Sequence, residues 1–129
     1  KVLTETTHVL KLLQADAVVV QGDTTTASLV ALAAFYQRIP VVHVEAGLRT
    51  RNIYSPFPEE TNRNMISNIA SLHFPATLWA RNNLLSESKH HYQIVLAGNP
   101  VVDALYMTLK KPVSNTIKSI RKWVEQNSF

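Results

Sequence analysis

Two carboxylates follow apolar runs that are typical of buried strands. Asp23 lies in QGDTTT, directly after AVVVQ, and Glu45 closes the run VVHVE. Each acid has a glycine within two residues, which lets the backbone turn sharply and approach a ligand. Because ligands bind at the carboxyl ends of the strands in open α/β sheets, the two acids are predicted to converge on one crevice.

A structural interpretation of Asp23 competes with this one. An aspartate between a strand and a helix is often the helix N-cap, where its carboxylate accepts hydrogen bonds from free backbone N–H groups. The six residues of QGDTTT favour this interpretation when they are considered alone. A cap and a ligand contact can also coexist.

A third group of charged residues precedes and opens a later predicted helix. Glu59 and Glu60 stand at its start, where the helix dipole favours acids. The three arginines Arg49, Arg51 and Arg63 flank them. Carboxylates and guanidinium groups together form either a structural network or a site for a phosphorylated, hydroxyl-rich ligand. Composition leaves both alternatives open.

His43 and Glu45 lie two apart on one predicted strand and therefore share a face. His-x-Glu opens the zinc deaminase signature, but that signature also needs cysteines and the chain has none. His43 is either a hydrogen-bonded core residue or a donor to Glu45 or a substrate. The sequence also contains no glycine-rich dinucleotide loop, P-loop or nucleophile elbow, so we expect no bound cofactor and no metal.

Strand and helix patterns alternate along the chain. Apolar periodicity predicts helices over 2–14, 24–38, 59–72, 77–87, 100–109 and about 117–124, and strands over 17–21, 41–45, 72–75 and 93–100. This alternation predicts a parallel, Rossmann-like α/β sheet with helices on both faces. The first helix has no strand before it, and the chain starts with Lys1, so we expect a piece of a longer protein.

Composition excludes several other classes. The 129 residues suffice for one modest core, and no apolar run is long enough to cross a membrane. The net charge of +4 comes from residues 110–129, because Lys/Arg and Asp/Glu balance over residues 1–109. A short basic tail is weak support for nucleic-acid binding, so we expect no nucleic-acid partner. The lack of cysteine makes the cytoplasm the default location.

Four segments together resemble one enzyme family. VVVQGDTTT, VVHVEAGLRT, YSPFPEETNR and AGNPVVDAL, in this order and spacing, are similar to the non-hydrolysing UDP-N-acetylglucosamine 2-epimerases. The resemblance implies a GT-B architecture of two Rossmann-like domains. It also implies interconversion of UDP-N-acetylglucosamine (UDP-GlcNAc) and UDP-N-acetylmannosamine (UDP-ManNAc) for cell-surface polysaccharides, without a redox cofactor.

The same resemblance assigns the candidate site residues. Asp23 and Glu59 are expected to be the acid and base, and Glu45 is expected to contact the substrate or stabilise charge. The residue patterns described above add His43 and Arg49 as expected substrate contacts. One departure is Arg51, which stands where a glycine is common in the family.

The resemblance further implies that residues 1–109 are part of the N-terminal domain and that residues 110–129 are a basic hinge or tail. The second domain, with a catalytic histidine and most uridine contacts, has no counterpart in these residues. We therefore expect these 129 residues alone to be inactive, and a full-length protein to form a homodimer. The alternatives are a non-catalytic remnant or interaction module, and a hydrolysing sugar-nucleotide relative.

Overall fold

The computed structural model describes residues 1–112 and 114–127 of the chain. The chain consists of two compact units, residues 1–99 and residues 100–129. The helix that follows Asn99 falls in the second of these units. In the described residues, no helix combines the length and the apolar character that crossing a membrane requires.

A three-stranded parallel sheet forms the centre of the first unit. Its strands are β1 (Val18–Gln21), β2 (Val41–Val44) and β3 (Leu72–Phe74), in the spatial order β1-β2-β3. Six of the eight residues in β1 and β2 are valine, and the other two are Gln21 and His43. β-branched side chains such as valine suit a pleated, buried surface. The register pairs Val20 with His43, and His43 with His73.

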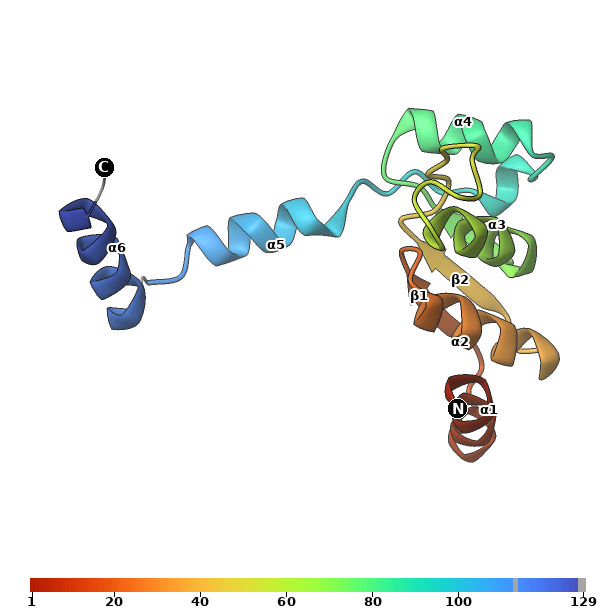
Figure 1. Ribbon diagram of the computed structural model, residues 1–129. Helices are drawn as coiled ribbons and strands as arrows, with labels where there is room; N and C mark the ends of the chain where they lie inside the picture. The colour runs from red at the N-terminus through yellow and green to blue at the C-terminus, as the bar shows by residue number, and fades with distance from the viewer. Residues whose placement is uncertain (113, 128–129) are drawn as a thin grey trace. The chain divides into compact units, whose positions relative to one another are not determined.

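The two faces of this sheet differ in burial. Val18, Val20, His43 and His73 point to a buried face, where α2 (Thr25–Tyr36) and α3 (Glu59–Ile69) pack. Figure 1 shows these two helices lying against β1 and β2. The side chains on the opposite face of the sheet are partly exposed, and Val19 among them is 66% exposed. In the described residues, the predicted helical cover is therefore complete on one face and partial on the other.

The predicted fourth strand over residues 93–100 is wrong. His91–Gln93 form a 3-10 turn, and Ile94 makes one isolated parallel bridge to His73. Val95 and Ala97 donate to the carbonyls of His73 and Pro75. A regular parallel ladder would also need an N–H from Pro75 between these two bonds, and proline has none, so no continuous strand pairing forms.

The remaining helices agree with the predicted periodicity. α1 (Val2–Leu13) ends at Gln14, whose φ is 49°, and α4 (Leu78–Ser86) begins after the N-cap Thr77. α4 approaches the end of β2 closely at Gly47, because a Cβ built there would lie 2.2 Å from the Ala80 carbonyl oxygen. The glycine of EAG thus lets α4 pack against this turn.

The second unit contains two helices, α5 (Pro100–Leu109) and α6 (Asn115–Asn127). The large apolar side chains of both helices are exposed where the structure describes them, among them Leu105 and Trp123. The assignment of residues 1–109 to an N-terminal domain and of residues 110–129 to a basic hinge or tail stays a prediction.

Candidate active site

Asp23 lies in the turn between β1 and α2. Gly22 there has a φ of +71°, a conformation that glycine adopts without strain, and its carbonyl lies 2.9 Å from His43 Nε2. The N-cap of α2 is Thr24, whose Oγ1 accepts a hydrogen bond from Ala27 N at 3.1 Å. The interpretation of Asp23 as N-cap is therefore wrong, and its carboxylate is left for other contacts.

Helix α3 holds both the backbone and the side chain of Asp23. Asn62 Nδ2 donates to the Asp23 carbonyl at 2.9 Å, and Ser28 Oγ of α2 donates to Asn62 Oδ1. Arg63 contacts Asp23 Oδ2 from Nε at 2.7 Å and from Nη2 at 2.6 Å. Within the part of the chain that the structure describes, Asp23 Oδ1 receives no hydrogen bond.

Glu60 is fully buried beside this pair. Its Oε2 lies 3.1 Å from Arg63 Nη1, and its Oε1 accepts the backbone N–H of Arg51 at 2.9 Å. Burial alone would raise the pKa of Glu60, but hydrogen bonds from the Arg51 and Thr50 backbone and from Arg63 bring the pKa below its ordinary value. The i, i+3 spacing of Glu60 and Arg63 was the available sequence signal for this network.

Glu45 lies close to the turn that carries Asp23. Its φ is +66°, which is uncommon for a residue other than glycine. A Cβ built on Gly22 would lie 3.7 Å from Glu45 Oε2, so the carboxylate stands directly over that glycine. Asn99 Nδ2 approaches Glu45 Oε1 at 3.4 Å. The structure thus brings the ends of β1 and β2 together, as the sequence predicted.

Glu59 is the first residue of α3 and is partly exposed. It precedes Arg63 by four residues, a spacing that puts two side chains on the same side of a helix. Because Arg63 contacts Asp23, Glu59 belongs to the side of α3 that faces the Asp23 turn. Its carboxylate makes no hydrogen bond or ion pair with the described residues.

His43 and His73 are neighbours on β2 and β3 and are both buried. Burial lowers the pKa of His43, so the ring is neutral and Nε2 is the nitrogen that donates to the Gly22 carbonyl. Burial, Coulombic coupling to the His43 ring and the charges of Lys89 and Arg49 lower the pKa of His73 to about 4. His43 therefore orients the turn of Asp23, which agrees with its interpretation as a hydrogen-bonded core residue.

Arg49 contacts residues other than Asp23. Its Nε and Nη2 contact the two carboxylate oxygens of Glu87 at 2.7 Å each, and Nη2 also donates to Ser67 Oγ. Nη1 donates to the Leu48 carbonyl. These contacts give Arg49 a structural role, and the substrate contact expected of it stays a prediction.

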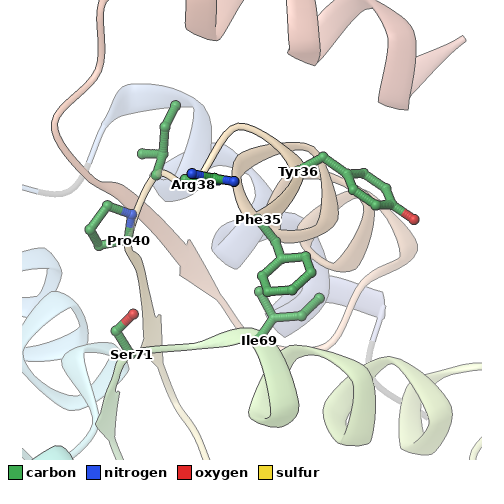
Figure 2. A pocket seen from close by; sticks show the side chains of 7 residues that line it. Phe35, Tyr36, Arg38, Pro40, Ile69 and Ser71 are labelled. Carbon is green, nitrogen blue, oxygen red and sulfur yellow. The ribbon is translucent and has the colours of Figure 1, made fainter.

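A separate surface pocket of about 560 Å³ lies at the opposite edge of the sheet. Pro40 and Ser71 line it just before β2 and β3 begin, and Figure 2 shows the Phe35 ring beside Ile69 there. The acids of the candidate site are not among its lining residues. No cluster of metal-ligating side chains occurs in residues 1–112 and 114–127.

Known proteins resemble this chain in sequence and in fold. A curated relative from Neisseria meningitidis, a UDP-N-acetylglucosamine 2-epimerase, is 50% identical over 117 residues, which are 91% of this chain and 32% of the relative. The crystal structure of the N. meningitidis epimerase bound to UDP-GlcNAc matches 98% of this chain and 33% of its own, with a TM-score of 0.86 and 47% identity.

A more distant solved structure is the Methanocaldococcus jannaschii UDP-GlcNAc 2-epimerase in complex with UDP-GlcNAc and UDP. It is 38% identical, with a TM-score of 0.84 over 95% of this chain and 34% of its own. The chain thus spans about a third of the length of these relatives. The family model described as UDP-N-acetylglucosamine 2-epimerase matches residues 1–129. On this evidence, the chain belongs to the UDP-N-acetylglucosamine 2-epimerase family.

Proposed function

We propose that this chain supplies the Asp23, Glu45 and Glu59 carboxylates of an enzyme that interconverts UDP-GlcNAc and UDP-ManNAc. The observation that carries the proposal is the position of the Glu45 carboxylate over the turn of Asp23, at the carboxyl ends of two adjacent parallel strands. The likeness to structures that hold UDP-GlcNAc supports the choice of ligand.

The chemistry proceeds by elimination and re-addition. The C1–O bond breaks and UDP leaves with the bonding electrons, which gives C1 oxocarbenium character and makes the C2 proton acidic. A base removes that proton, and the C2–H electrons form the double bond of a glycal. UDP then adds back to C1, and an acid protonates C2 from the other face, which inverts this centre.

The three carboxylates suit different steps of this reaction. Asp23 and Glu59 are the acid and base candidates, because Asp23 Oδ1 accepts no hydrogen bond from the described residues and Glu59 is partly exposed. Glu45 stabilises the positive charge that develops at C1. His43 acts on the substrate through the turn that it orients. Further groups would come from the parts of the relatives that extend beyond this chain.

Several broader statements belong to the same proposal. The enzyme would supply an activated sugar for cell-surface polysaccharides and act in the cytoplasm, as a homodimer. The cysteine-free composition is compatible with that location. These 129 residues alone are expected to be inactive, because one proton-transfer partner and most uridine contacts would lie elsewhere.

A chimera tests the proposal directly. This chain replaces the matching third of the N. meningitidis epimerase, and the products formed from UDP-GlcNAc are separated. We expect UDP-ManNAc, whereas free N-acetylmannosamine with UDP would indicate a hydrolysing relative. Asp23→Asn should lower kcat by about 10²- to 10⁴-fold, the usual range for an acid or base. Unimpaired turnover in that variant would refute the role of Asp23.

A matched control is Asp16→Asn. Asp16 is exposed and precedes β1, at the opposite end of the strand from Asp23. The same chemical change at this position should leave turnover in the chimera unaltered. Equal losses in both variants would mean that the chimera responds to any lost charge, and Asp23 would then have no special role.

A further inference from the structure

Glu60 and Arg63 form a linked pair that contacts two separate parts of the candidate site. Nε and Nη2 of Arg63 contact Asp23 Oδ2, and Nη1 donates a hydrogen bond to Glu60 Oε2. The other carboxylate oxygen of Glu60, Oε1, accepts a hydrogen bond from the Arg51 backbone N–H. One helix turn therefore fixes both the Asp23 carboxylate and the loop that follows β2.

The burial of this pair argues that its geometry is specific. The side chain of Glu60 is 1% exposed and that of Arg63 is 14% exposed, whereas Asp23 is 25% exposed. A buried charge is costly unless its partners are well placed, and a pair of apolar residues would often be as stable. Stability alone therefore gives little reason for a buried glutamate at this position.

The contacts on Asp23 are also unequal. Two of the three guanidinium nitrogens, Nε and Nη2, reach Oδ2, while Oδ1 receives no hydrogen bond within the described ranges. The rigid, planar guanidinium fixes the direction of the carboxylate, which a flexible ammonium group cannot do. Oδ1 is thus held in one orientation, on a side chain that is 25% exposed.

We propose that Glu60 and Arg63 are positioning residues, which present Oδ1 of Asp23 to the substrate and hold the loop after β2 against α3. This rests on the proposed role of Asp23. Arg63 acts through Asp23, and Glu60 acts through Arg63 and through the Arg51 backbone. Neither residue is required to touch the sugar.

The first test uses the chimera with Arg63→Gln and Arg63→Lys. Arg63→Gln should lower kcat by about 10- to 100-fold with a smaller effect on KM. The acidic limb of its pH profile should move to higher pH, because the cation that favours an ionised carboxylate is gone. Arg63→Lys should restore the pH profile more than kcat, since it returns the charge without the planar fork.

The control is Arg121→Gln. Arg121 belongs to an exposed ion pair with Glu125 on α6, and its loss should leave kcat and the pH profile unchanged. A fall in kcat for Arg63→Gln with an unmoved acidic limb would overturn the positioning role and leave a structural one. Normal kcat in Arg63→Gln would overturn it as well.

The second test needs no activity. In this chain, Glu60→Gln should increase hydrogen exchange of the Arg51 amide by tenfold or more, because a charged acceptor is replaced by a weaker neutral one. The Ile66 amide, in the middle of α3, serves as the internal reference. Unchanged exchange at Arg51 would overturn the loop-holding role. Inactivity of every chimera would instead count against the proposed function. The exchange experiment would still test whether Glu60 holds the loop after β2, because it does not depend on activity.

Discussion

Arg63 Nε lies 2.7 Å from Asp23 Oδ2, across 40 residues of sequence. This contact joins the PEETNR and QGDTTT segments, and Asn62 and His43 add hydrogen bonds to the Asp23 and Gly22 carbonyls. Side chains from α3 and β2 therefore determine where the Asp23 carboxylate lies.

Glu45→Gln should lower kcat of the chimera by about 10²-fold or more, because the neutral amide cannot stabilise positive charge at C1. Steady-state kinetics with UDP-GlcNAc measures the effect. Glu5→Gln, on the exposed side of α1, is the matched control and should have wild-type kinetics. Wild-type turnover in Glu45→Gln would exclude a charge-stabilising role.

Arg51→Gly should raise the free energy of unfolding by roughly 0.5–1 kcal/mol. Arg51 has a φ of +64°, which costs a non-glycine residue about 1–2 kcal/mol, and the added backbone entropy of glycine offsets part of the gain. Urea unfolding measures the change. Arg81→Gly, inside α4, should instead lower the free energy of unfolding by about 1 kcal/mol, because glycine is unfavourable in a helix interior. A loss at both positions would contradict the backbone-strain argument.

Stability should fall as the pH drops from about 6.5 to about 4. The pKa of His73 is about 4 in the folded chain, against an ordinary value of 6.5 in the unfolded chain. Between these two pH values the unfolded chain therefore binds more protons than the folded chain, and protonation favours unfolding. The loss amounts to about 3 kcal/mol at pH 4. Urea unfolding at several pH values should show this slope, and His73→Leu should reduce it.

The control for this prediction is His8→Gln, which replaces an exposed histidine of α1. The slope between pH 6.5 and 4 should persist in that variant. If His73→Leu keeps the full slope, other groups cause the acid sensitivity. At pH 7.5, His73→Leu should be at least as stable as the parent, because neither ring nitrogen of His73 has a partner among the described residues.

Gly47→Ala should destabilise the chain by roughly 3 kcal/mol. A Cβ at this position would meet the Ala80 carbonyl oxygen at 2.2 Å, and the φ of +84° adds strain. Gly98→Ala is the matched comparison, because its φ of +77° is similar but no atom lies within 4 Å. That variant should lose only about 1 kcal/mol. Equal losses would show that close approach of α4 does not matter.

Thr24→Ala should cost about 1 kcal/mol of stability, because the N-cap hydrogen bond to Ala27 N is lost. Thermal or urea unfolding measures the change. Thr26→Ala, at an exposed position inside α2, should be neutral or slightly stabilising. A larger effect at Thr26 than at Thr24 would contradict the assignment of the cap.

The sequence by itself determined the order of the elements and the edge of the sheet at which Asp23 and Glu45 lie. Both follow from local patterns: valine-rich runs form buried strands, and glycines permit the turns after them. The same local reasoning failed over residues 93–100. There the apolar pattern suits a strand, but Pro75 on the neighbouring segment cannot donate the hydrogen bond that a continuous ladder needs.

The tertiary structure alone decided which charged residues are partners. Glu59 and Glu60 are adjacent and chemically alike, yet one is partly exposed and the other is buried against Arg63. Arg49 pairs with Glu87, 38 residues away, and not with Asp23. Periodicity constrains neighbours within a few residues, whereas an ion pair depends on where packing places distant side chains, and that information is absent from any short segment.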